Sequence, residues 1–335
     1  MSDVISADHL PIKLPRIFGI RNLSEVFKTC ELVRSTTGPV TLDGSDTEFF
    51  DPLGIAVLGA LLEPICADRT ITIEWLPVQV GTYLDRMQVL ARCAIEGVES
   101  SGIHRNPLND SLVELTKVSH EREVDDAANR LATAVAGKLT KEDPEGRRDD
   151  ATGLNRFESF RHPLRYALSE LLLNALSHAK REGRGDAAVW VAAQYYKKDG
   201  VVQLAVVDNG CGILATLKNS PLLDEKTHLS AIPTALKPFV SCNPDLGMPG
   251  GTANRGVGLT TTSRIARAAR GSLMVVSGDA GLRSGATRAF ALDDGARWDG
   301  VAISMTCRRA ALPSINIPQL LPPLDDAPKI SLQFS

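Results

Sequence analysis

A stripe of polar residues with helical spacing crosses an otherwise apolar segment of the 335-residue chain: Glu170, Asn174, Ser177 and Arg181. Pro163 suits the first turn of this helix, and Gly183 suits its end. Glu170 and Asn174 lie one turn apart, which places a candidate base beside a neutral oxygen ligand. Such a pair suits the polarisation of a water molecule next to Mg²⁺. The alternative is a stripe on a core helix that only faces solvent.

An acidic residue and two glycines follow a predicted β-hairpin. Residues 187–196 and 201–207 have strand patterns and are joined by a turn. Asp208 comes at the end of the second strand, and Gly210 and Gly212 would let a planar ligand approach the backbone. The carboxylate could then accept a hydrogen bond from an exocyclic amine. Asp-Asn-Gly is also common in plain turns.

A further pair of glycines, in Gly256-Val257-Gly258-Leu259, precedes the helical pattern of residues 260–269. Backbone N–H groups at the start of a helix form an anion site that suits phosphates. The segment lacks the Gly-Lys-Ser/Thr of a Walker P-loop, and no strand precedes it as in a Rossmann fingerprint. Taken alone, it also fits an ordinary loop.

In this order and spacing, the three segments resemble the motifs of the GHKL ATPases, a group named after gyrase, chaperone, histidine kinase and mismatch-repair proteins. The N box resembles residues 170–175, the G1 box residues 208–212 and the G2 box residues 256–259. The resemblance implies a domain that binds ATP and Mg²⁺. It also implies the Bergerat fold, an α/β sandwich with a mixed sheet and helices on one face.

The family implies a role for each matching residue. Glu170 would be the water-activating base, and Asn174 would be the Mg²⁺ ligand. Asp208 would bind the adenine amine, in a pocket that Gly210 and Gly212 shape. The phosphates would lie against the second pair of glycines and its neighbours: Arg255, Gly256, Val257, Gly258 and Leu259.

The resemblance has further consequences and one departure. Residues 214–253 would form a lid over the nucleotide. His178, just beyond the N box, could lie near the nucleotide. The alternative, which we favour, is a histidine at the helix surface or at the edge of the core. The family often has Gly-Thr in its last strand, but Val301 follows Gly300 here. The threonine contact near adenine is therefore in doubt, unless Thr287 supplies it.

The first half of the chain alternates helical and strand patterns, which predicts a small α/β domain with a partly parallel sheet. Within it, residues 49–54 (Phe-Phe-Asp-Pro-Leu-Gly) resemble the switch segment of STAS domains, the anti-anti-sigma type. That family carries a phosphorylatable serine in Asp-Ser-Ser-Gly. Pro52 and Leu53 occupy the serine positions here, so a hydroxyl switch is chemically impossible. A plain turn between strand and helix, capped by Asp51, is the alternative.

These patterns divide the chain into three regions. Residues 1–145 would be the STAS-like domain with its following helix, and residues 146–308 the ATPase domain. A proline-rich tail, residues 309–335, would run extended over the surface.

The composition indicates a cytoplasmic protein. The formal net charge is −3, from 37 basic and 40 acidic residues, without a run of like charges that would attract nucleic acid or a membrane surface. The six cysteines lie far apart with no C-x-x-C pair, which favours reduced thiols over a zinc site or disulfides. The chain shows neither a signal-peptide pattern nor an apolar stretch long enough to span a bilayer.

Three functions fit these features. The first is an ATP-hydrolysing conformational switch, and the second is a protein kinase of the anti-sigma (Ser/Thr) or histidine kinase type. The third is a non-catalytic scaffold gated by nucleotide. A protein partner would bind through the STAS-like domain or the lid, and a homodimer would also fit. We rank the switch first.

Overall fold

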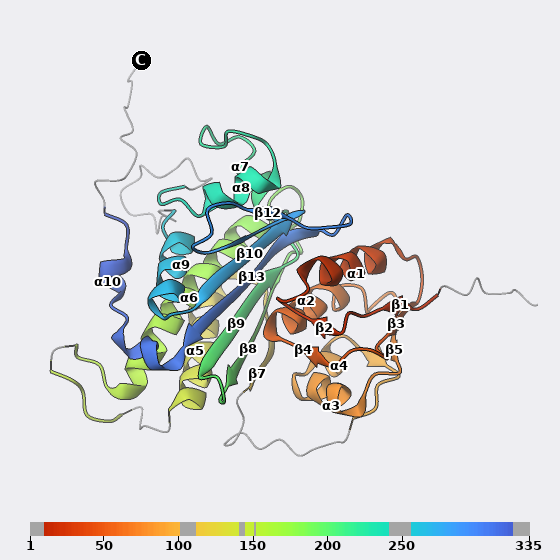
Figure 1. Ribbon diagram of the computed structural model, residues 1–335, viewed down its shortest axis with the longest axis horizontal. Helices are drawn as coiled ribbons and strands as arrows, with labels where there is room; N and C mark the ends of the chain where they lie inside the picture. The colour runs from red at the N-terminus through yellow and green to blue at the C-terminus, as the bar shows by residue number, and fades with distance from the viewer. Residues whose placement is uncertain (1–9, 101–111, 141–144, 151, 241–255, 324–335) are drawn as a thin grey trace, which may run out of the picture.

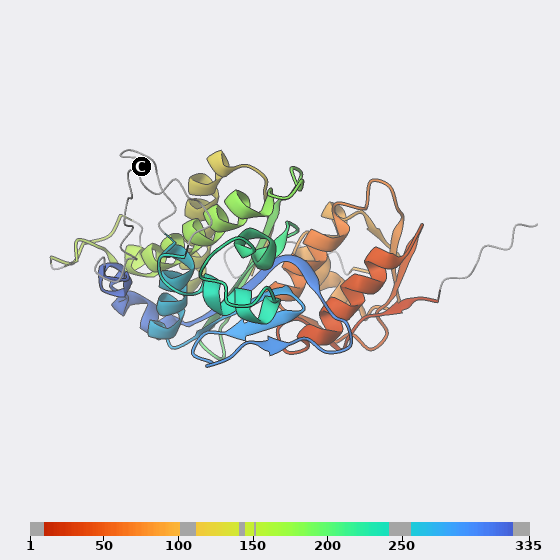
Figure 2. The same ribbon diagram turned by 90° about the horizontal axis from the view of Figure 1, so that it is seen from above.

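The computed structural model describes residues 10–100, 112–140, 145–150, 152–240 and 256–323. They form two parts that lie side by side (Figures 1 and 2). The first part is built on a small parallel sheet and the second on a large antiparallel sheet, so the predicted α/β class is confirmed. Within the described residues, no helix has the length and apolar character needed to cross a membrane.

The first part contains a parallel sheet with the strand order β1–β3–β5–β6: β1 (Ile12–Lys13), β3 (Val40–Asp43), β5 (Ile71–Glu74) and β6 (Ile95–Glu96). A second parallel pair joins β2 (Ile17–Phe18) to β4 (Phe49–Phe50). The helices are α1 (Leu23–Ser35), α2 (Pro52–Leu62), α3 (Val78–Arg86) and α4 (Val89–Arg92). Helices α3 and α4 are separated near Gln88, where φ is +64°.

The second part contains a seven-stranded sheet with the order β12–β11–β10–β13–β9–β8–β7. Its strands are β7 (Leu112–Val118), β8 (Val189–Tyr196), β9 (Val201–Asp208), β10 (Ser272–Gly278), β11 (Ala280–Arg283), β12 (Phe290–Ala291) and β13 (Trp298–Arg308). The predicted hairpin is confirmed as β8 and β9. Every pairing in this sheet is antiparallel, whereas we expected a mixed sheet. Strands that follow each other in the chain, such as β8 and β9 or β10 and β11, pair as neighbours, and the chain reverses direction between them.

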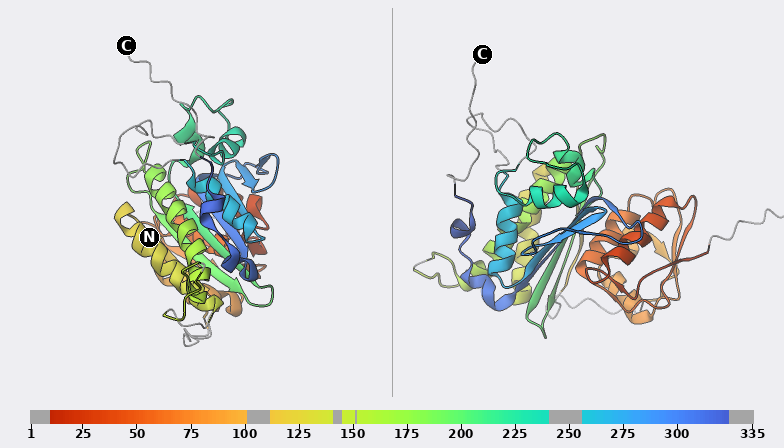
Figure 3. Two further views of the ribbon diagram at one scale, coloured as in Figure 1. Left: turned by 90° about the vertical axis from the view of Figure 1, so that its left-hand side faces the viewer. Right: turned by 45° about the horizontal axis from the view of Figure 1, so that its top comes forward.

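Three helices cover one face of this sheet, as expected: α5 (Val124–Leu139), α6 (Arg156–Ala179) and α9 (Gly258–Ala268). Two short helices lie over one end of the sheet, α7 (Gly212–Leu217) and α8 (His228–Ala235) (Figures 1 and 3). Helix α8 and most of α7 fall within the predicted lid, of which residues 241–253 lie outside the described residues.

The first part covers the opposite face of the sheet. Helix α2 is buried along its whole length and packs against β8 and β9. A Cβ atom on its Gly59 would lie only 2.7 Å from Leu115 and 3.0 Å from Trp190, so the glycine permits this close approach. Apolar residues of both parts therefore form one continuous core cluster.

Two elements near the predicted domain boundary belong to the second part. Strand β7 pairs with β8 at the edge of the large sheet, and α5 packs along α6. A boundary after residue 145 would divide this sheet and its helical layer, so we place β7 and α5 in the second part. The predicted boundary differs because it relied on local patterns, which do not reveal the long-range pairing of β7 with β8.

The ends of the second part also differ from expectation. Helix α6 begins at Arg156, because the side chain of Asn155 caps it by accepting the N–H of Glu158 at 2.7 Å. Pro163 lies inside the helix instead of in its first turn. After β13, the short helices η2 (Arg309–Ser314) and α10 (Ile317–Leu320) pack on α6 and α9, so residues 309–323 are not an extended tail. Residues 324–335 lie outside the described residues.

Candidate active site

The carboxylate and carboxamide of the N box lie next to the start of α9. Glu170 and Asn174 are half-buried on α6. A Cβ atom on Gly258 would lie 2.0 Å from Oε2 of Glu170 and 3.1 Å from Nδ2 of Asn174. The glycine therefore lets the first turn of α9 approach these two side chains without moving Glu170.

The surroundings of the Glu170 carboxyl group favour its protonated form. Burial raises the pKa of Glu170 above its usual value, and a hydrogen bond from Tyr166, one turn earlier on α6, partly offsets this rise. In turn, burial and the charge of Glu170 raise the pKa of Tyr166 to about 12. The tyrosine therefore stays protonated and can donate to the carboxylate.

Asp208 is almost completely buried at the end of β9, with 2% of its surface exposed. Its Oδ1 accepts the backbone N–H of Gly210 at 2.9 Å and that of Val301 at 3.2 Å. Burial raises the pKa of Asp208 to about 7, although these two hydrogen bonds favour the ionised form. Oδ2 has no hydrogen-bond partner among the described residues and remains free to accept from a ligand.

Each of the two glycines of the G1 box is required for a different structural reason. A Cβ atom on Gly210 would lie 2.3 Å from the Cα atom of Ala179, so the glycine lets the loop rest on the end of α6. Gly212 has a φ of +78°, a left-handed conformation that disfavours other residues. The loop then enters α7 directly.

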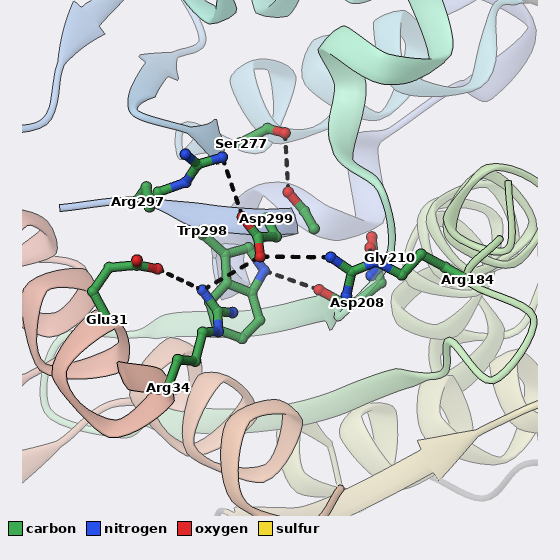
Figure 4. A network of polar contacts seen from close by, with 10 residues as sticks. Glu31, Arg34, Arg184, Asp208, Gly210, Ser277, Arg297, Trp298 and Asp299 are labelled. Carbon is green, nitrogen blue, oxygen red and sulfur yellow. Dashed lines mark hydrogen bonds and ion pairs between the residues drawn. The ribbon is translucent and has the colours of Figure 1, made fainter. Parts of the chain in front are cut away.

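A segment of β13 completes the surroundings of Asp208 (Figure 4). Trp298 donates from Nε1 to the backbone oxygen of Asp208 at 2.9 Å. A Cβ atom on Gly300 would lie 2.1 Å from the same oxygen, so a glycine is needed there. The hydroxyl of Ser277, on β10, donates to the oxygen of Gly300 at 2.9 Å and accepts the N–H of Ile213 at 3.0 Å. Local sequence patterns do not reveal Trp298 and Ser277 as site residues, because only the pairing of β13 with β9 and β10 brings them here.

The hydroxyl of Ser277 thus joins the backbone of β13 to the start of α7. Thr287 is exposed in the loop between β11 and β12 and does not line the cavity described below. The predicted replacement of the family threonine by Thr287 is not supported by its position.

One open cavity, with about 820 Å³ of space that is partly open to solvent, brings most of the predicted residues together. Its lining includes residues from all three motifs: Asn174, Asp208, Gly212, Gly256, Gly258 and Leu259. Glu170 adjoins it through Gly258, and Val257 is the residue before the first turn of α9. Gly210 lies behind the lining, against Ala179. Arg255 lies outside the described residues.

His178 also lines the cavity, one turn beyond Asn174. Burial, together with the charge of Arg181, lowers the pKa of His178 to about 4. The imidazole that lines the cavity is therefore neutral near pH 7.

Residues 161–295 match the family model described as histidine kinase-, DNA gyrase B- and HSP90-like ATPase. The chain contains a GHKL-type ATPase domain. The match includes all three motifs, whereas β13 lies just beyond it. No curated protein and no solved structure matches the chain.

The STAS-like segment of the first part is not covered by the family match. In the structure, Asp51 caps α2: its Oδ1 accepts the N–H of Gly54 at 2.9 Å, and its Oδ2 accepts the N–H of Ile20 at 2.8 Å. Pro52 and Leu53 are buried. This is the capped turn that the alternative interpretation expects, while kinship with STAS domains stays a prediction.

Proposed function

We propose that the protein is a conformational switch that binds ATP and Mg²⁺ and hydrolyses ATP. The observation that carries the proposal is the convergence of three motifs, distant in sequence, on one cavity inside a GHKL-type ATPase domain. An acid, a carboxamide and the start of a helix are the groups that a purine, a metal ion and a triphosphate require.

Asp208 would recognise the base. Gly210 and Val301 occupy its Oδ1, so Oδ2 is the acceptor for the exocyclic amine of adenine. The phosphates would lie at the N-terminus of α9, near Gly256, Val257, Gly258 and Leu259, where free N–H groups and the helix dipole favour negative charge. Arg255, next in sequence, would add a positive charge.

Glu170 would take the proton of the attacking water. Its raised pKa makes it a better proton acceptor than an ordinary carboxylate, and α9 brings the phosphate site beside it. Asn174, one turn later, offers a neutral oxygen of the kind that Mg²⁺ accepts, so the residues fit this ion. When bound, Mg²⁺ would neutralise charge on the triphosphate.

The switch would act through α7 and α8. Helix α7 begins at Gly212 in the base pocket, and Lys218, just after its end, pairs with Glu182 beyond α6 at 2.7 Å. Nucleotide in the cavity would thus contact the lid segment and α6 together. Closure around ATP and relaxation after hydrolysis would alter the surface that a partner meets.

The test measures phosphate release by wild type, Glu170→Gln and the control Glu121→Gln, which changes an exposed glutamate at the start of η1. We expect a loss of about 100-fold or more for Glu170→Gln, the scale of general-base catalysis, and none for the control. A thermal shift with ATP and Mg²⁺ should persist in Glu170→Gln and weaken in Asn174→Ala. Equal turnover in wild type and Glu170→Gln would exclude Glu170 as the base.

A parallel incubation with ATP labelled on the γ-phosphate separates hydrolysis from phosphoryl transfer. The switch predicts label in free phosphate only. Label on this chain, or on a protein of a cell extract, would instead support a kinase of the Ser/Thr or histidine type. ATP binding with neither release nor transfer would support the scaffold.

A further inference from the structure

The aspartate of the base pocket is held by a tryptophan that also touches the first part of the molecule. Trp298 is fully buried, and its indole N–H donates to the backbone oxygen of Asp208 at 2.9 Å (Figure 4). Three residues later, the N–H of Val301 holds the Oδ1 atom of the same aspartate at 3.2 Å. One short segment of β13 therefore fixes both the peptide and the carboxylate of Asp208.

The ring of Trp298 is in turn held by helix α1. The guanidinium carbon of Arg34 lies 4.5 Å from the ring centre, within the range of a cation–π contact. The ring of Phe27 lies 5.8 Å away. Arg34 is oriented by Glu31, at 2.8 Å, and lies 4.0 Å from Asp299. The indole thus cannot shift without breaking contacts with the first part.

We propose that Trp298 is a positioning residue for adenine recognition, and that Arg34 and Phe27 make the first part of the molecule a component of the nucleotide site. The proposal rests on the ATP binding proposed above. Loss of the indole N–H frees the peptide of Asp208, so that Oδ2 is less well aligned with the adenine amine. Because coupling is reciprocal, ATP in the site stabilises the seating of α1 on Trp298.

The decisive variant is Trp298→Phe, which keeps an aromatic ring and removes the N–H donor. Calorimetry compares ATP with purine riboside triphosphate, which lacks the exocyclic amine. We expect the variant to bind ATP about fivefold more weakly, the scale of one lost hydrogen bond, and to bind purine riboside triphosphate as wild type does. A merely structural role would weaken both ligands alike.

A second variant avoids any change inside the core. Arg34→Gln removes the cation over the ring from a partly exposed position, and should weaken ATP binding about two- to threefold with the same dependence on the amine. The matched control is Lys28→Gln, also on α1, because Lys28 pairs with Asp294 of the second part at 3.3 Å without touching Trp298. The control should bind both ligands as wild type does.

The possible results separate the two proposals. If wild type does not bind ATP, the proposed function fails and this inference fails with it. If wild type binds ATP and Trp298→Phe keeps both its affinity and its preference for the amine, the inference alone is overturned. Should Trp298→Phe not fold, Arg34→Gln decides: an effect no larger than that of Lys28→Gln overturns the inference.

Discussion

Replacing Asp208 by asparagine should stabilise the free protein and at the same time weaken adenine recognition. Burial raises the pKa of Asp208 to about 7, whereas an aspartate in an unfolded chain titrates at about 3.9. Between these values the folded chain binds more protons than the unfolded chain, so stability falls as the pH rises through this window. Relative to the unfolded chain, the raised pKa costs about 4 kcal/mol of folding free energy at pH 8, where the buried group is mainly ionised, and about 3 kcal/mol at pH 6, where it has taken up a proton.

Asparagine avoids this cost. Its Oδ1 can still accept the N–H groups of Gly210 and Val301, and its amide carries no charge. We therefore expect Asp208→Asn to raise the free energy of unfolding, and to raise it by about 1 kcal/mol more at pH 8 than at pH 6. The amide nitrogen would occupy the position of Oδ2 and meet the adenine amine as a second donor. The affinity for ATP should consequently fall at least about tenfold.

Urea denaturation at both pH values, with and without ATP and Mg²⁺, measures both effects. The exposed Asp126 on α5 provides the control variant Asp126→Asn, which should change neither. If Asp208→Asn lowered the stability of the free protein equally at both pH values, the argument from the buried charge would be refuted. If the variant kept the full ATP-induced stabilisation, Asp208 would not be the acceptor for adenine.

Two further substitutions test other contacts. Gly258→Ala places a methyl group 2.0 Å from Oε2 of Glu170, so phosphate release should fall about tenfold or more while urea unfolding changes little, since a glutamate side chain can move aside; unchanged turnover would contradict the close approach of α9 to the base. Asp51→Ala leaves the buried N–H group of Gly54 and the partly buried N–H group of Ile20 without their acceptor and should lower the free energy of unfolding by about 2–4 kcal/mol. The exposed Asp46→Ala should cost far less, and equal losses would show that the cap is not the cause.

The sequence predicted the parts of the site that depend on local spacing. The separation of Glu170 from Asn174 is one helical turn, and a strand that ends in Asp208 needs only the pattern of its own residues. The start of α9 at Gly258 follows from the same kind of local pattern. In the first part, the alternation of helical and strand patterns was sufficient to predict the α/β class, because it is also a local pattern.

The sequence did not predict features that depend on distant pairing. Trp298 and Ser277 reach the base pocket only because β13 lies between β9 and β10. By residue type, Thr287 could replace the family threonine near adenine, but its loop lies at the far edge of the sheet. Pro163 suggested a helix start, whereas Asn155 supplies a cap that lets α6 begin earlier and continue through the proline.

The burial of α2 on every side has a consequence for biosynthesis. Residues 52–62 leave the ribosome long before β8 and β9, which cover one side of this helix in the finished molecule. Until then the nascent chain exposes the side of this apolar helix that packs on β8 and β9, and a fragment that began at β7 would expose the complementary strands around Trp190. Neither half is therefore suited to exist alone, and the protein should melt as a single cooperative unit.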